Sequence, residues 1–246
     1  GAQLGEGASG HIHQATCNDS GTAIALKVFK AAATSDGSPQ SELAAGLAAG
    51  QHPQLLTPLA RVDGHPDGRL AMALPLLPAS LRNLAGPPSL DSCTRDVYAP
   101  DTAFTPATAQ RLLAGVRSAV QHLHDHGVLH GDIKPGNVLL SEQGVRLFDF
   151  GLGQSEAGQL QGLASLSRTR FNAWTPGYAA PELRHGGPLT RQAELYSVGC
   201  LLHELATGKP PFNPRIPALS EYPPQRSPHK KPRHLPSQFW SALQKA

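Results

Sequence analysis

The stretch from Leu129 to Gly151 holds four polar side chains suited to phosphate and metal chemistry, set among apolar residues. Asn137 and Asp149 offer an amide and a carboxylate oxygen, the hard ligands that Mg²⁺ or its substitute Mn²⁺ takes beside substrate phosphates. Asp132 can orient an attacking hydroxyl and accept its proton. Lys134 can neutralise a phosphoryl group during transfer. The alternative interpretation is that both aspartates only cap turns beside strands.

A glycine-rich segment near the start has the pattern G-x-G-x-x-G at Gly5, Gly7 and Gly10. Glycine lets the backbone approach a phosphate closely, although a plain glycine-rich turn would have the same pattern. A dinucleotide-binding fold would need a helix within the motif, whereas residues 11–16 alternate as a strand does. The GK[ST] ending of a P-loop is also absent from the sequence. The pattern therefore predicts a hairpin that covers a phosphate.

Lys27 follows Gly10 on the next predicted strand, where it can contact phosphates as a point charge. Such a lysine must be held in place by a carboxylate. Glu42 is the only glutamate between Lys27 and the following strands, and it lies at the start of a predicted helix. We therefore expect an ion pair between Lys27 and Glu42.

Short apolar runs and helical spacing indicate alternating strands and helices. Gly46 is expected to weaken the first of these helices by about 1 kcal/mol relative to alanine. The expected strands are residues 22–30, residues 69–74 (ended by Pro75), and two strands joined by a turn at 141–144. The expected helices are residues 41–49, 106–126, 195–207 and one beginning near 237. Residues 85–106 are expected to form a loop or insertion, and residues 209–236, which are rich in proline, an irregular segment.

The bulk composition is that of an ordinary globular domain with a buried core. The chain has 246 residues, of which 39% are hydrophobic and 16% charged. A net charge of +3 is a weak excess. It does not argue for binding of nucleic acid, which usually requires a clustered basic face. The three cysteines are far apart in sequence and favour reduced thiols. Neither a membrane-spanning run nor a signal peptide is recognisable in the sequence.

Taken in order, these motifs resemble the eukaryotic-like serine/threonine protein kinases, in a bacterial-type form with an H-G-D catalytic loop. The resemblance runs from Leu4 to about Phe212. It rests on the glycine loop, Lys27, Glu42, the catalytic loop His130–Asn137, Asp149-Phe150-Gly151, Ala180-Pro181-Glu182 and the helix text Glu194–Gly199.

The resemblance implies an α+β fold with two lobes. Residues 1–76 would form a small β-rich N-lobe, and residues 77–246 a larger, mainly helical C-lobe that ends early. ATP and Mg²⁺ would lie between the lobes. Asp132, Lys134, Lys27 and Glu42 would then be catalytic, and Thr175 would support Asp132 and Lys134. ATP would be bound by Gly5, Gly7, Gly10, Ile12, Ala25 and Lys27, and by a hinge at Ala73–Leu76 through Leu74 and Leu76.

Three features depart from the pattern of this family. Gly131 replaces an arginine that pairs with a phosphate on the activation segment, so we expect activation to be independent of such a phosphate. Glu194 replaces an aspartate that holds the backbone of the catalytic loop. Glutamate is longer by one methylene, so whether Glu194 holds the loop in the same way is left open. Glu182 has no recognisable arginine partner in residues 237–246.

Three functions are compatible with this reading. The first is transfer of phosphate from ATP to serine or threonine hydroxyls of a protein substrate, in the cytoplasm or as the cytoplasmic domain of a longer protein. The second is a nucleotide-binding pseudokinase that acts as a scaffold or regulator. The third is a small-molecule kinase, which the Ala180-Pro181-Glu182 and Thr175 segments disfavour because they shape a peptide site.

Overall fold

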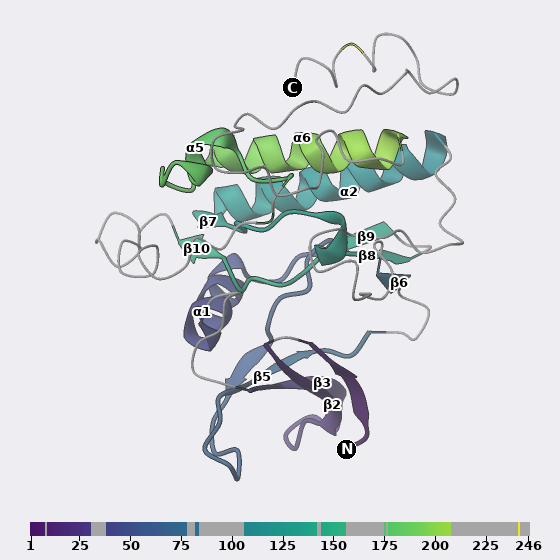
Figure 1. Ribbon diagram of the computed structural model, residues 1–246. Helices are drawn as coiled ribbons and strands as arrows, with labels where there is room; N and C mark the ends of the chain where they lie inside the picture. Colours follow the sequence, from purple (N-terminus) through teal and green to yellow (C-terminus); the bar gives the residue numbers. More distant parts are fainter. Residues whose placement is uncertain are drawn as a thin grey trace.

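A computed structural model describes residues 1–7, 9–30, 38–77, 82–83, 106–141, 144–155, 175, 177–207 and 241. The expected loop at 85–106, the proline-rich segment and most of the expected C-terminal helix lie outside these residues. The described residues form a sheet at one end and two long helices at the other, with small strands between them (Figure 1).

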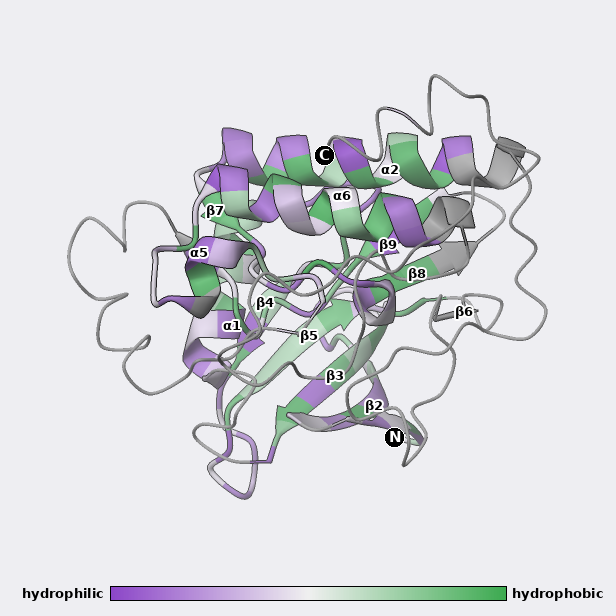
Figure 2. Cartoon of the chain, turned by 45° about the horizontal axis from the view of Figure 1, so that its top comes forward, coloured by the Kyte–Doolittle hydropathy of each residue, from purple (hydrophilic) through white to green (hydrophobic). Residues whose placement is uncertain are grey.

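The N-terminal sheet has five antiparallel strands in the order β1-β2-β3-β5-β4. The strands are β1 (Gln3–Glu6), β2 (Gly10–Thr16), β3 (Ala23–Phe29), β4 (Ala60–Val62) and β5 (Ala71–Pro75). Apolar residues concentrate on β3 and β5, at the middle of the sheet (Figure 2). The predicted strands and the hairpin made by the glycine-rich segment are confirmed.

Pro75 is the last residue of β5, so the strand ends at this proline as expected, one residue later than the predicted run 69–74. Polar groups of alternate residues point to the same side of a strand, and the carbonyl of Ala73 accepts a hydrogen bond from the amide of Leu59. The nitrogen of Pro75 therefore faces that same side, beyond Ala73, where the pairing between β4 and β5 stops. A missing N–H is tolerated there, as at a sheet edge.

Helix α1 (Pro39–Ala49) lies between the sheet and the rest of the molecule (Figure 1). The Ser38 hydroxyl caps its N-terminus by accepting a hydrogen bond from the amide of Ser41, 3.1 Å away. Gly46 weakens the helix intrinsically, but the structure explains its presence. A Cβ at this position would run into the ring of Pro58, so the glycine allows close packing.

The second part of the fold is built around α2 (Pro106–Asp125) and α6 (Arg191–Thr207), which pack side by side. Leu112, Val116 and Leu123 on α2 are fully buried, as their helical spacing predicts. The remaining elements of this part are short. They are β6 (Arg82–Asn83), β7 (Val128–Leu129), the 3₁₀ turn η2 (Pro135–Asn137), β8 (Val138–Ser141), β9 (Gly144–Leu147), β10 (Gln154–Ser155) and α5 (Pro181–Arg184).

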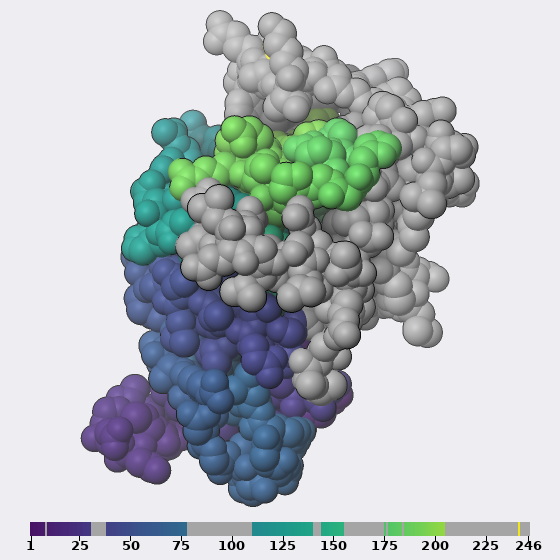
Figure 3. All heavy atoms as spheres, turned by 90° about the vertical axis from the view of Figure 1, so that its left-hand side faces the viewer, coloured from purple at the N-terminus to yellow at the C-terminus, as the bar shows by residue number. Residues whose placement is uncertain are grey.

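One apolar core joins α1 to the helices of the lower half. Ala45 and Ala49 of α1 share a buried cluster with Leu123 of α2 and Leu201 of α6. From the side, α1 and the segment that follows it lie directly against residues of the α2 region (Figure 3). The position of α1 is therefore determined by both halves of the molecule.

The described residues contain no helix long and apolar enough to cross a membrane. Two of the three cysteines, Cys17 and Cys200, carry free thiols, and Cys93 lies outside the described part. Burial raises the pKa of the Cys200 thiol to about 12. That thiol is therefore an unreactive part of the core at neutral pH.

Candidate active site

Lys27 on β3 and Glu42 on α1 form the ion pair that the sequence predicts. The Lys27 Nζ lies 2.5 Å from Glu42 Oε1, and the two side chains are only 11% and 5% exposed. The Phe29 ring, on the same face of β3, lies 4.9 Å from the Lys27 Nζ. Because both charges are largely removed from water, each one depends on the other. The pair therefore fixes α1 to the sheet and aims the lysine.

The glycine hairpin places its three glycines in different surroundings. A Cβ at Gly10 would lie 2.7 Å from the carbonyl oxygen of Val28, so only glycine fits beside β3. No described atom lies within 4 Å of a Cβ built at Gly5 or Gly7. The space beside these two glycines is therefore open, while the Gly7 amide donates a hydrogen bond to the Gly10 carbonyl, at 2.9 Å. Phosphate binding by this hairpin stays a prediction.

The remaining predicted nucleotide contacts gather in one apolar cluster on the sheet. Ala25 and Leu74 are buried there, with Ile12 and Leu76 packed against them. By alternation from Ala73, the backbone groups of Leu74 and Leu76 point away from β4. The ladder between β3 and β5 ends at Ile24 and Pro75, so Leu76 lies beyond it. The apolar cluster, next to a backbone amide of Leu76 that lies beyond the strand pairing, suits a purine ring.

Asp132 lies at the centre of the polar groups contributed by the catalytic loop. Its Oδ1 accepts a hydrogen bond from the Thr175 hydroxyl, at 2.6 Å. Its Oδ2 lies 2.9 Å from Asn137 Nδ2 and 3.0 Å from Lys134 Nζ. Lys134 also donates to the Thr175 hydroxyl, at 3.0 Å. The carboxylate is thus held on both oxygens, and Oδ1 keeps a lone pair for a further donor.

Asn137 and Asp149 fit the role of metal ligands. Asn137 is buried, and its side chain gives both of its described hydrogen bonds from Nδ2, to the backbone oxygen and the carboxylate of Asp132. This leaves its Oδ1 without a donor among the described residues, which is unusual for a buried amide oxygen. Asp149 has a φ of 69°, the only non-glycine residue with positive φ among those described, and its Oδ1 accepts a hydrogen bond from the amide of Gly151, at 3.2 Å. The carboxylate is thus held in a turn, with Oδ2 available to a metal.

Two protein oxygens are the number that Mg²⁺ takes when substrate phosphates and water complete its shell. Within the described ranges, no group of three or more His, Cys, Asp or Glu side chains could hold a metal by itself. The residues present therefore fit a metal that arrives with a nucleotide.

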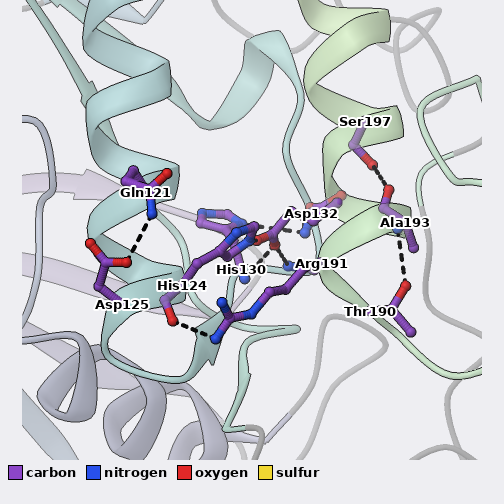
Figure 4. A network of polar contacts seen from close by, with 11 residues as sticks. Gln121, His124, Asp125, His130, Asp132, Thr190, Arg191, Ala193 and Ser197 are labelled. Atoms are coloured by element: carbon purple, nitrogen blue, oxygen red, sulfur yellow. Dashed lines mark hydrogen bonds and ion pairs between the residues drawn. The ribbon is translucent and has the colours of Figure 1, made fainter. Parts of the chain in front are cut away.

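Glu194 on α6 anchors the catalytic loop, which settles the question left open by its extra methylene. Its Oε1 accepts hydrogen bonds from the amides of His130, at 2.5 Å, and Gly131, at 2.9 Å. Its Oε2 lies 2.7 Å from Nε2 of His124 on α2. Arg191 bonds the carbonyl of His124 at 2.7 Å, where α2 and α6 meet (Figure 4). The longer side chain thus reaches both the loop and the neighbouring helix.

The backbone conformation of Gly131 explains why no arginine stands there. Its φ is 81°, and a Cβ would lie 2.6 Å from the carbonyl oxygen of Leu152. Any side chain would therefore be strained by both conformation and contact. The hypothesis that activation is independent of loop phosphorylation stays a prediction.

Gly131→Ala is expected to destabilise the fold more than Gly64→Ala does. Gly64 has a similar φ of 79° but nothing within 4 Å of a Cβ, so its substitution tests conformation alone. That conformational penalty is about 1–2 kcal/mol. Urea denaturation of both variants measures the difference in unfolding free energy. Equal losses at the two positions would contradict the contact with Leu152.

Two further interactions support the segment that would face a substrate, and the sequence analysis missed them. The Tyr178 hydroxyl donates a short hydrogen bond to the buried carboxylate of Glu204, and Ser197 donates to the Tyr178 carbonyl at 2.8 Å. A glutamate inside the apolar run of α6 was the available signal. Glu182 is exposed and makes no side-chain contact within the described residues, and any partner in residues 208–240 lies outside them.

Comparison with protein families gives a match to the protein kinase domain over residues 1–222. The chain belongs to this family. The two-lobed α+β fold expected from the motifs is confirmed, with a β-sheet N-lobe and a helical C-lobe.

Curated relatives carry serine/threonine kinase names. The DNA damage-responsive serine/threonine-protein kinase RqkA of Deinococcus radiodurans is 33% identical, covering 86% of this chain and 30% of its own length. The probable serine/threonine-protein kinase PknB of Corynebacterium glutamicum is 34% identical over 52% of this chain and 20% of its own. The serine/threonine-protein kinase PkaA of Streptomyces coelicolor is 34% identical over a match that covers 58% of this chain and 26% of its own length. The matches span less than a third of each of these relatives.

Proposed function

We propose that this chain transfers the γ-phosphoryl group of ATP to serine or threonine hydroxyls of a protein substrate. The observation that carries the proposal is the environment of Asp132. Thr175, Lys134 and Asn137 hold its carboxylate while the Lys27–Glu42 pair is formed. Serine/threonine specificity is supported by the names of the relatives and by the contact of Lys134 with Thr175.

Each predicted residue has a role in this proposal. The glycine hairpin and Lys27 bind the phosphates, and Asn137 and Asp149 hold the divalent cation. Bound Mg-ATP would supply the phosphoryl group, and its Mg²⁺ would supply the positive charge that offsets the negative phosphate oxygens. Asp132 orients the acceptor hydroxyl and takes its proton on Oδ1, and Lys134 lies beside it to offset negative charge. The lobe boundary at residues 76 and 77 and a cytoplasmic location, where ATP is supplied, are parts of the same proposal.

The alternative is a nucleotide-binding pseudokinase that acts as a scaffold or regulator. It was motivated by Gly131 and Glu194, and the geometry accommodates both, because Glu194 bonds the loop and glycine suits a φ of 81°. Lys27, Asp132 and Asp149 are all present. These observations favour transfer over scaffolding.

Incubating the chain with γ-labelled ATP, Mg²⁺ and a generic basic protein tests the proposal. We expect label to appear in the acceptor or in the chain itself, and to disappear when a chelator removes the metal. A thermal shift with Mg-ATP without labelling of any protein would favour the pseudokinase instead.

A further inference from the structure

Three histidine rings pack in a row, called the stack below, where the end of α1 meets α2; the first pair is stacked and the second is tilted. The ring centroids of His52 and His122 are 4.5 Å apart with an angle of 25° between the planes. Those of His122 and His126 are 4.1 Å apart at 37°. His52 lies in the segment after α1, whereas His122 lies in the last turn of α2 and His126 just beyond that helix. The stack therefore bridges the two halves of the core.

The hydrogen-bond partners assign the tautomer of each ring, because a carbonyl oxygen only accepts. Nε2 of His122 lies 2.8 Å from the carbonyl of Ala49 and must carry a proton. Nδ1 of His126 lies 2.8 Å from the carbonyl of His122 and must also carry one. Nδ1 of His52 instead accepts from the amide of Gln54, at 3.3 Å. His52 is therefore neutral in this arrangement.

The bond from His122 ends on the last residue of the helix that carries Glu42. Ala49 closes α1, and Glu42 lies about two turns earlier on the same rigid helix. The segment after α1 is separately tied to β9 by two backbone hydrogen bonds, from Leu56 to Leu147 and from Leu147 to Gln54, at 2.9 and 2.8 Å. Those bonds join backbone groups only, so they do not depend on the state of the histidine rings.

We propose that His122 is a positioning residue, which holds α1 so that Glu42 meets Lys27, and that its stack with His52 and His126 makes this hold weaken in acid. The proposal rests on the proposed function for its catalytic consequence. Its structural part, the control of α1, does not need phosphoryl transfer.

Few charges near the stack could offset added protons. Glu42, the only charged residue of α1, is paired with Lys27, and residues 50–59 contain no titratable side chain besides His52. On α2, Asp125 accepts a hydrogen bond from Gln121, and His124 faces Glu194. Arg117 adds a positive charge one residue before Ser118, which contacts His52. A proton added to Nδ1 of His52 would take the place of the Gln54 amide hydrogen that this nitrogen accepts, and residues 50–59 hold no carboxylate to offset the charge.

Burial, followed by the charges of His122 and His126, lowers the pKa of His52 from its ordinary value. A depressed pKa means that the unfolded chain binds the proton more readily. The contribution of His52 to stability is therefore complete above about pH 6.5, its ordinary pKa, and is lost as the pH falls below that value. The stack should loosen in the same range.

Hydrogen exchange of the α1 amides, followed by mass spectrometry at pH 8 and pH 6 and corrected for intrinsic exchange, tests the proposal. His122→Ala removes the bond to Ala49 and should speed exchange of α1 by about 2- to 10-fold at pH 8. His122→Gln keeps a hydrogen-bond donor but removes the imidazole ring, so the α1 amides should exchange as in the wild type at pH 8. Between pH 8 and pH 6 their corrected exchange rate should rise less than it does in the wild type. His65→Gln, in the turn before β5, is the matched control.

Kinase activity measured over the same pH range gives the catalytic readout. The wild type and His65→Gln should lose kcat for transfer below about pH 6.5, and His122→Gln should lose less. If His122→Ala and His122→Gln exchanged like His65→Gln at both pH values, the proposal would be overturned. Altered exchange in a chain that transfers no phosphate would support the hold on α1 and reject the proposed function.

Discussion

Replacing Asp132 with alanine is expected to lower kcat for phosphoryl transfer by about 10²- to 10⁴-fold, the usual contribution of a positioned general base. The Asp132 carboxylate is held by Thr175, Asn137 and Lys134, and Oδ1 retains a lone pair for the acceptor hydroxyl. Nothing in this arrangement contacts the apolar cluster expected to bind adenine. The affinity for ATP should therefore change little.

Steady-state kinetics with varied ATP separate these two effects, since a group used only in the transition state lowers kcat without raising KM. Asp63→Ala, which removes an exposed carboxylate after β4, is the matched control and should keep wild-type kcat. An Asp132→Ala variant with normal kcat would remove the proposed base from the mechanism.

Glu194→Ala should produce the largest loss of stability. The substitution leaves the amides of His130 and Gly131 and Nε2 of His124 without their acceptor. One buried and one half-buried amide without partners cost about 2–6 kcal/mol together at most, out of about 5–15 kcal/mol for a whole domain. Urea denaturation followed by circular dichroism measures the change in unfolding free energy.

The shorter Glu194→Asp tests why a glutamate stands at this position. An aspartate can keep the loop amides only by withdrawing from His124, so its loss of stability should fall between that of Glu194→Ala and the wild type. Glu6→Ala, at an exposed carboxylate, is the control and should lose nothing measurable. A Glu194→Ala variant as stable as Glu6→Ala would show that the anchor does not hold the loop.

Local patterns in the sequence predicted much of the fold and the residues of the site. Alternation and helical spacing identified β2, β3, α1 and the buried face of α2, because each of these elements buries apolar residues in one of two clusters, to both of which α1 contributes. The pairing of Lys27 with Glu42 followed from the lack of another glutamate nearby. Asp132 and Asn137 lie close together because only five positions separate them.

The interactions that the sequence could not predict join residues far apart in the chain. His124 and Glu194 are 70 residues apart, and His122 and Ala49 are 73 apart. No periodicity links such positions, and their contact depends on how α1, α2 and α6 pack. The long side chain of Glu194 is explained only by its second partner, and Gly131 only by its backbone conformation.

The most direct test of the central claim identifies the residues that receive label from γ-labelled ATP. Wild type and Asp132→Ala would be incubated in parallel with Mg²⁺ and a basic protein acceptor, followed by phosphoamino-acid analysis. We predict phosphoserine or phosphothreonine with the wild type and almost none with Asp132→Ala. Equal labelling by both chains, or label only on tyrosine or a small molecule, would contradict the assignment of a serine/threonine protein kinase site around Asp132.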